Sequence, residues 1–380
     1  MNQTIAPTLV AAQAQSAQTP VFDLLARSWT LEAGITDVAM DPAGKVAGFA
    51  LTDGRVALMS LDDADSPFSR MRVEADSGRS TIRPREKPVA APILTAKLAE
   101  GAPFLTPSKM IGLIVAAPDG RIHRVTPRGQ VIVLNSTPGP VFAVASDGLG
   151  HLAIARDGRT DLLEETGMTR LASLLTAGPA TALAFAPDDQ SLAVMMQDSL
   201  IMGHPRQGYE THPLGGSGPM AFSKSGAWLA GSNGKDGIWL LRRSDRQVAC
   251  IGKFRARPSA IAFSSAANAV FASGAFRVAG WSLSNPPFES ETHGALKTGR
   301  SGLVLIERVA AHPVRELIAL GTADGAVSVA QAGRPEEMTV RQADGGAITA
   351  LAWSADGAHL AIGTATGNAA LVTLPPQLFK

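Results

Sequence analysis

Arginine side chains recur directly after predicted turns, and a guanidinium group can bind carboxylate or phosphate through paired hydrogen bonds. Three segments read Asp-Gly-Arg and end at Arg55, Arg121 and Arg159. Arg277 occupies the comparable position of another segment, and further arginines stand in or near the connections between segments: Arg255, Arg257, Arg300 and Arg341. If these side chains converge on one opening, they form a basic ring suited to an anionic partner. The alternative is that each arginine lies along the surface of its own strand.

Other chemistry has weaker support. The seven histidines are scattered, and no pair has the spacing of metal ligands on one strand or helix. His312 and His359 fall at or beside predicted turns, where we expect solvated side chains. Cys250 has no histidine nearby to activate it, so we expect it to be buried in an outer strand. The segment "LGGSGP" lacks the lysine and helix of a phosphate loop, and no Gly-x-Ser-x-Gly motif occurs. We therefore predict no catalytic residue, metal site or cofactor.

Composition narrows the class of protein. Of 380 residues, 45% are hydrophobic and 18% are charged, which lies within the globular range. The net charge is +1 and aromatic residues make up 5%, so we expect no nucleic acid partner. No apolar run approaches the roughly 18 residues that a membrane helix needs, so we expect no membrane insertion. A single cysteine excludes an internal disulfide framework and favours a reducing compartment, which predicts a cytoplasmic location.

A repeated pattern of three apolar runs must position any functional residue. Clear copies are "AMDPAGKVAGFALTDGRVALMSL" from Ala39, "AFSKSGAWLAGSNGKDGIWLL" from Ala221 and "AWSADGAHLAIGTATGNAALVTL" from Ala352. Short runs rich in Val, Ile, Ala and Leu, bounded by Gly, Pro, Asp and Asn, are typical of strands and hairpins. The first run ends at an aligned residue in six copies: Met40, Phe185, Phe222, Phe263, Ala311 and Trp353. Two looser copies begin at Val141 and Ile93, which makes eight.

Each copy is expected to carry a fourth, outer strand. More polar segments follow the third run, namely "QVIVLNS", "MTRLASL", "YETHPL", "RQVACIGK", "FESETH" and "EEMTVRQ". The last copy ends at "LVTLPPQLFK" without such a segment, whereas "LLARSWTLEAG", near residue 30, precedes the first copy. We therefore predict that this N-terminal strand completes the last unit and closes a ring, which removes an exposed sheet edge.

This pattern resembles the WD-repeat β-propeller family, whose four-stranded units are about 40–45 residues long. The resemblance covers about residues 22–375. It assigns third-strand positions to Trp239 and Trp281. It assigns turn positions to six glycines: Gly54, Gly120, Gly158, Gly237, Gly325 and Gly367. The chain has no Trp-Asp dipeptide, and no unit opens with the family's Gly-His pair, so we expect the units to cohere mainly by apolar packing. The predicted fold is an all-β, closed β-propeller of four-stranded antiparallel blades. Eight blades are expected; seven would require the copy at Ile93 to be an insertion.

The expected domain organisation is a flexible N-terminal tail over residues 1–20 and a single propeller domain over residues 21–380. Two connections are long, at residues 66–92 and 285–303. We expect an outer strand around "RMRVEA" in the first of them, followed by a mobile basic loop. Its basic residues are Arg70, Arg72, Arg79, Arg83, Arg85 and Lys87. Loops on a rigid scaffold often carry recognition.

The resemblance implies a non-enzymatic scaffold or adaptor that binds a protein or peptide partner through its top face. This face holds the connections before each first strand and the turns between second and third strands. The candidate binding residues are Arg55, Arg121, Arg159, Arg255, Arg257, Arg277 and Arg300. The alternative is an enzyme or small-ligand binder that uses the central channel. Convergent carboxylates or histidines with perturbed pKa values would favour that alternative, and an arginine-rich rim would favour the scaffold.

Overall fold

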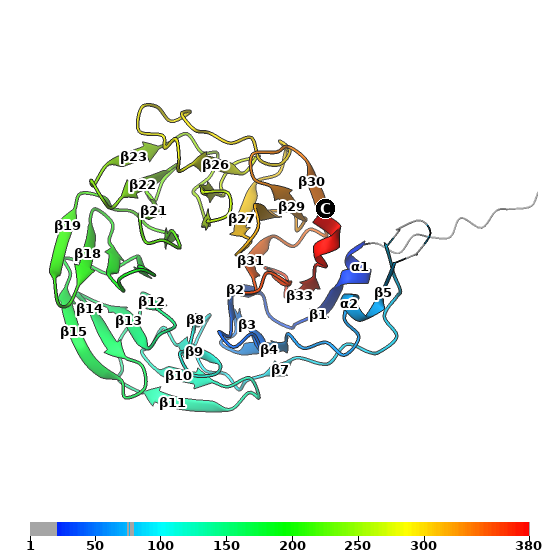
Figure 1. Ribbon diagram of the computed structural model, residues 1–380. Coiled ribbons are helices and arrows are strands. Elements are labelled where there is room, and N and C mark those ends of the chain that lie inside the picture. Colours follow the sequence, from blue (N-terminus) through cyan, green and yellow to red (C-terminus); the bar gives the residue numbers. More distant parts are fainter. Residues whose placement is uncertain (1–20, 74–75, 77–79, 380) are drawn as a thin grey trace, which may run out of the picture.

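The structure is a computed structural model that describes residues 21–73, 76 and 80–379. Eight antiparallel sheets follow one another around a central axis, and Figure 1 shows the chain passing once around this ring. The predicted all-β, closed, eight-bladed propeller is confirmed, and the seven-bladed alternative is wrong. The predicted tail, residues 1–20, lies outside the described residues. In the part of the chain that the structure describes, no helix is long and apolar enough to cross a membrane.

The first four blades have the same order of strands from the channel to the rim. Blade 1 contains β2 (Ile35–Met40), β3 (Val46–Leu51), β4 (Val56–Ser60) and β7 (Ile93–Leu94). Blade 2 contains β8 (Phe104–Pro107), β9 (Leu113–Ala116), β10 (Ile122–Val125) and β11 (Val131–Asn135). Blade 3 contains β12 (Ala143–Ser146), β13 (His151–Arg156), β14 (Arg159–Glu164) and β15 (Thr169–Leu175). Blade 4 contains β16 (Ala182–Phe185), β17 (Leu192–Met195), β18 (Leu200–His204) and β19 (Gly208–His212).

The other four blades complete the ring. Blade 5 contains β20 (Met220–Phe222), β21 (Trp228–Ser232), β22 (Ile238–Arg242) and β23 (Val248–Ile251). Blade 6 contains β24 (Ile261–Ser264), β25 (Ala269–Ala272) and β26 (Ala279–Ser282). Blade 7 contains β27 (Ile306–Ala311), β28 (Leu317–Thr322), β29 (Val327–Gln331) and β30 (Glu337–Arg341). Blade 8 contains β31 (Ile348–Trp353), β32 (His359–Thr364), β33 (Asn368–Thr373) and β1 (Ala26–Thr30).

The two ends of the chain share blade 8, as the sequence predicted. β1 pairs antiparallel with β33, from Ala26 opposite Val372 to Thr30 opposite Asn368. A short helix, α1 (Val21–Leu25), leads into β1, and a 3₁₀ helix, η1 (Pro376–Phe379), follows β33. Figure 1 shows α1 and the C-terminus on the same side of the ring. Closure gives the outer side of β33 a partner strand.

The outer strand of blade 6 differs from the prediction. The segment "FESETH" forms turns, because Phe288 stacks on Trp228 of blade 5 and Trp281 Nε1 donates to Glu291 O (2.8 Å). Residues 294–296 run beside β26 instead, through a bridge between Trp281 and Ala295 and further backbone hydrogen bonds on either side of it. The second long connection is therefore packed against the ring along most of its length.

The outer strand of blade 1 also lies elsewhere than predicted. Ile93 does not begin blade 2, because β7 pairs with β4 and Pro92 cannot extend that pairing. The segment "RMRVEA" is not an outer strand, since β5 (Met71–Val73) pairs with β6 (Ser80–Ile82) in a separate hairpin.

The expected basic loop is anchored to the ring over much of its length. A short helix, α2 (Pro67–Arg70), precedes the hairpin, and its last side chain, Arg70, is fully buried. The Arg70 guanidinium donates to the carbonyls of Asp65 (3.0 Å), Arg83 (2.5 Å) and Leu24 (2.6 Å). Residues 74–75 and 77–79, including Arg79, lie outside the described part. Arg70 is thus a structural anchor rather than a free cation.

The cores lie between neighbouring blades. The second strand of most blades is completely buried; β3 and β21 are examples. Between blades 8 and 1, Phe49 and Ile35 pack with Ala361 and Leu371. Complete burial of a side chain such as Phe49 contributes roughly 1.5–3 kcal/mol. The blades thus cohere by the apolar packing that the sequence predicted.

Glycine is required at the turns between second and third strands. Five of the six predicted turn glycines have φ between 66° and 108°, a region that L side chains rarely adopt: Gly54, Gly120, Gly158, Gly325 and Gly367. Gly237 does not have a positive φ. Its longer loop is held by Asn233, whose Oδ1 accepts from Lys235 N (2.9 Å) and Gly237 N (3.2 Å).

Candidate interaction surface on the top face

Two of the predicted arginines are paired with acids of their own turns. Arg55 lies 2.7 Å from Asp53 Oδ2 and 3.1 Å from Glu32 Oε2. Arg121 lies 2.8 Å from Asp119 Oδ2, and its hydrogen bond holds the pKa of the Asp119 carboxyl below the usual value. Each of these guanidinium groups is neutralised locally, so they offer less net charge to a partner.

Two further predicted arginines are also engaged. Arg159 lies 3.1 Å from Asp161 Oδ2, within the same strand. Arg341 is buried and binds the Gly325 carbonyl and the Asp344 carboxylate. Arg159 and Arg341, like Arg55 and Arg121, are thus bound within the protein, which fits the alternative to a ring of arginines that face a partner.

Arg255, Arg257 and Arg277 form a different group. Of the described ion pairs, none includes any of these three side chains. Arg255 and Arg257 are exposed and Arg277 is half-buried, with its Nε buried and without a hydrogen-bond partner.

Backbone hydrogen bonds bring their connections together at the top of blade 6. Arg255 N and Ala256 N both donate to Gly274 O (3.0 Å each), which joins the connection from blade 5 to the turn before β26. Gly302 N donates to Phe276 O (3.0 Å), which adds the connection to blade 7. Two exposed apolar side chains lie on these segments, Phe276 and Leu303, the latter 94% exposed. We call Arg255, Arg257, Arg277, Phe276 and Leu303 the blade 6 patch.

Arg300 is not part of this patch. Its backbone N donates to Glu337 Oε2 (3.3 Å) on the outer strand of blade 7, so it lies on the flank of the ring. The predicted inward-facing ring of arginines is thus replaced by one local group and several paired residues. Partner binding by any of these arginines stays a prediction.

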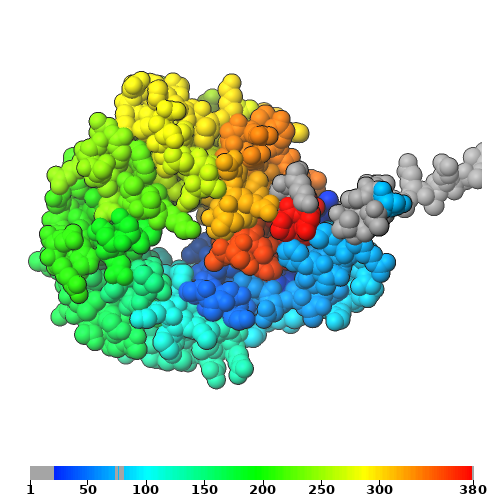
Figure 2. All heavy atoms as spheres, viewed as in Figure 1, coloured from blue at the N-terminus to red at the C-terminus, as the bar shows by residue number. Residues whose placement is uncertain are grey.

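The central channel is the second candidate site, and Figure 2 shows an opening at the centre of the ring. Arg308 on β27 donates from Nε to Thr349 O (2.7 Å) and from Nη1 to Glu307 O (3.0 Å). Asp37 lies on β2, the innermost strand of blade 1. Asp37 is exposed to the channel, and the surrounding protein raises its pKa to about 6 by desolvation, although its hydrogen bond from Val38 N and the charge of Arg308 oppose the shift.

The Arg308 guanidinium also interacts with the charge of Glu307, its neighbour on β27. Within the described ranges, no group of three or more His, Cys, Asp and Glu side chains is placed to hold a metal ion. The inner strands thus bring Asp37, Arg308 and Glu307 near one another without a cluster of metal ligands.

Two expectations about burial are wrong, one for a histidine and one for the cysteine. His312 is buried rather than solvated, because its ring packs edge-on against Trp353 (4.8 Å between ring centres) and its Nδ1 accepts from Val314 N and Arg315 N. Cys250 is exposed rather than buried, because β23 alternates and directs Ala249 and the following isoleucine inward.

The comparisons with known proteins agree with this architecture. Residues 310–375 match the family model described as the anaphase-promoting complex subunit 4 WD40 domain. Residues 310–375 are therefore similar to a WD40 domain, and the whole chain has the β-propeller fold. No curated protein matches it by sequence at a significant level.

Solved structures share the β-propeller fold of this chain at low sequence identity. The WD40 repeats of RRP9 are 16% identical, with 92% of this chain and 98% of that chain covered and a TM-score of 0.54. The C-terminal WD40 domain of Sif2 is 14% identical, with 92% and 99% covered and a TM-score of 0.59. The computationally designed Ika8 protein is 15% identical, with 91% and 98% covered and a TM-score of 0.63. These likenesses support the fold alone.

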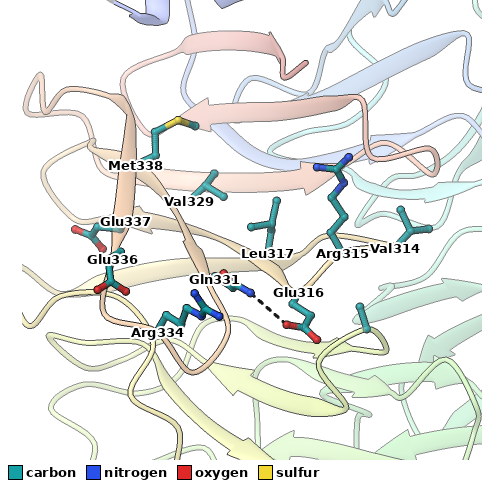
Figure 3. Close-up of a pocket in the computed structure, with 11 residues that line it drawn as sticks. Val314, Arg315, Glu316, Leu317, Val329, Gln331, Arg334, Glu336, Glu337 and Met338 are labelled. Atoms are coloured by element: carbon teal, nitrogen blue, oxygen red, sulfur yellow. Dashed lines mark hydrogen bonds between the residues drawn. The ribbon is translucent and has the colours of Figure 1, made fainter. Parts of the chain in front are cut away.

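A groove on the bottom face of the propeller was not anticipated from the sequence. It has a volume of about 740 Å³ and lies beside blade 7, with Leu317, Val329 and Met338 among its lining residues (Figure 3). Charged side chains of both signs surround it, and Gln331 Nε2 donates to Glu316 Oε2 (3.4 Å). No sequence motif marks this groove, because its walls combine three strands and two turns of blade 7 with Ala266 of blade 6.

Proposed function

We propose that this WD40-type propeller is a non-enzymatic scaffold that binds an acidic segment of a protein partner at the blade 6 patch. WD40 propellers commonly act as protein-interaction scaffolds, which supports the class of function. The single observation that carries the site is the group Arg255, Arg257 and Arg277, which has no ion-pair partner among the described residues.

The chemistry of the patch suits a carboxylate-rich, partly apolar ligand. An exposed guanidinium can form two parallel hydrogen bonds with one carboxylate. Arginine and aromatic side chains are enriched among the residues that contribute most to binding energy. The protein has a net charge of only +1, so attraction of an acidic partner would come from this local group rather than from the whole surface.

A pair of matched variants tests the proposal. The triple variant Arg255→Ala, Arg257→Ala, Arg277→Ala removes the unpaired charges, and Arg55→Ala, Arg121→Ala, Arg159→Ala removes the same number of paired ones. We expect the first variant to lose at least tenfold in affinity for a short polyglutamate peptide at low salt and to lose partners captured from the source cell. The second should keep both. Equal binding by the two variants would remove the patch from consideration.

The channel supports a second candidate function, a site for a small ligand. The observation in its favour is Asp37, whose pKa of about 6 lies in the range useful for proton transfer, with the Arg308 guanidinium on a nearby inner strand. Asp37→Asn should then abolish any ligand-induced rise in melting temperature seen in a screen of small metabolites, whereas the blade 6 variant should not. A screen without hits for the wild-type protein would count against this candidate.

We also propose a cytoplasmic location. It is supported by the single cysteine, Cys250, whose exposed thiol is compatible with a reducing compartment. Fractionation of the source cell with an antibody to the protein would test it.

A further inference from the structure

The outer strand of blade 2 presents an uncharged apolar edge, which is regular from Val131 to Val133 and is followed by a β-bulge at Leu134. β11 ends the sheet order β11-β10-β9-β8, so one of its sides has no paired strand in the described chain. Val131, Ile132 and Val133 are 38%, 37% and 63% exposed. An exposed edge strand with apolar side chains readily pairs with another strand, and natural proteins usually place charges or proline there to prevent it.

Most other outer strands of comparable length carry such protection. Exposed or half-buried charged residues lie within the outer strands of three blades, namely Arg170 in β15, Glu210 in β19 and Glu337 in β30, whereas the charge in β1, Arg27, is buried. β23 has no charged residue, but it buries alternate side chains in the core. β11 reads Val-Ile-Val-Leu-Asn, with its first three residues exposed and its last two half-buried. Its edge is therefore apolar on both faces.

The apolar surface continues beyond β11 onto blade 1. The Ile93 side chain packs over Gly129, in the turn before β11. Ile93 and Leu94 of β7 are each 44% exposed, and Ile111 of blade 2 is 60% exposed. Ile93 and Ile111 both line a cavity of about 820 Å³ between these blades. The exposed aliphatic residues thus form one continuous surface on the rim.

We propose that β11 pairs antiparallel with β11 of a second copy of this chain, across a two-fold axis at Ile132. In this register Val131 of each copy lies opposite Val133 of the other, and the pairing stays within the regular part of the strand before the β-bulge at Leu134. A strand without charge fits this edge best, because a charged partner would be desolvated with no counter-charge in β11. The chain itself supplies such a strand, and self-pairing brings no like charges together.

The size of the contact predicts a weak dimer. Three residues a strand, with the adjacent side chains of blade 1, fall short of the 20–30 residues a side that stable interfaces use. We therefore expect a dissociation constant of roughly 10–100 µM. The contact lies on the rim, on blades 1 and 2, so it is independent of the blade 6 patch.

Sedimentation over a range of concentrations, with two variants, tests this inference. The wild-type mass should rise from 39.3 kDa toward twice that value. Val133→Lys places a charge opposite Val131 of the second copy and should weaken association at least tenfold, whereas Leu171→Lys, on the outer strand of blade 3, should dimerise like the wild type.

Both variants should melt within a few degrees of the wild type, because both side chains are largely exposed, 63% and 48%. Slower hydrogen exchange of the β11 amides at high protein concentration would show that β11 forms the dimer contact. A wild-type chain that stays monomeric at roughly 0.5 mM would overturn the proposal. Dimerisation of Val133→Lys at wild-type strength, or loss of it in Leu171→Lys, would also overturn it.

Discussion

The substitution Asp63→Asn tests whether a buried ionic network fastens the ring closure. Arg27 lies in β1, which completes blade 8, and Asp63 follows β4 of blade 1. Arg27 Nε lies 3.6 Å from Asp63 Oδ2, and Arg85 donates two hydrogen bonds to the same carboxylate (2.9 and 2.5 Å). The three side chains are at most 14% exposed. One carboxylate therefore links the first blade, the last blade and the first long connection.

The size of the effect follows from what the variant leaves behind. Removing one partner of a buried ion pair costs about 3–5 kcal/mol, because the remaining charge stays desolvated. The amide of Asp63→Asn keeps an acceptor oxygen but removes the negative charge between Arg27 and Arg85. Arg27 keeps its hydrogen bonds to Leu61 O and Asp62 O (3.2 Å each). We expect a loss of about 3 kcal/mol in the free energy of unfolding, the lower end of this range.

Urea unfolding followed by circular dichroism measures this loss, with Asp188→Asn as the matched control. Asp188 pairs with Arg243 at 3.1 Å but is 41% exposed, so its loss should be below about 1 kcal/mol. Equal losses in the two variants, or a loss below about 1 kcal/mol for Asp63→Asn, would refute the reasoning.

The pH dependence gives an independent check. Burial acts to raise the pKa of Asp63, but the Arg85 hydrogen bonds, the Asp65 backbone N–H and the Arg27 charge lower it below 3.8 overall. The unfolded chain therefore binds this proton more readily than the folded one. The stabilisation is present above about pH 4 and is lost as the pH falls through the folded pKa. Asp63→Asn should lack this part of the acid dependence, and an unchanged acid dependence would contradict the network.

Three further predictions concern turns, closure and histidine. Gly54→Ala should lower the free energy of unfolding by roughly 2–4 kcal/mol, because φ is 91° and the added Cβ would meet the Ala99 carbonyl. The control Gly44→Ala, with a φ of 66° and no neighbour within 4 Å, should lower it by only roughly 1 kcal/mol in the same urea assay. Deleting residues 1–31 removes β1 and should cause aggregation in light scattering; deleting 1–20 should not, and a soluble 1–31 deletion would argue against closure. Burial lowers the pKa of His312, so stability should fall as the pH drops below about 6.5, and His312→Asn should show a shallower slope in melts from about pH 7 to 5.5.

Much of the fold could be predicted because its signals are local. Alternating apolar runs separated by Asp-Gly turns specify hairpins within a few residues, and the need for a positive φ explains Gly54 and Gly325. The missing outer strand after "LVTLPPQLFK" and the spare strand near residue 30 together predicted closure. The outer strands of blades 1 and 6 were misplaced because each depends on contacts with another blade or on where a proline interrupts pairing. Phe288, for example, is held by Trp228 of blade 5.

The candidate site shows the same division. The sequence by itself determined that arginines follow the turns and connections of one face, since strand order fixes which turns share a face. Only the tertiary structure decided which of them are paired, because Arg55 finds Glu32 across a connection while Arg257 finds no acid among the described residues. It alone decided that Arg70 and Arg27 are buried anchors and that β11 has a free apolar edge. Charge pairing, burial and edge exposure depend on contacts between segments that are distant in the sequence, and such contacts produce no repeating sequence pattern.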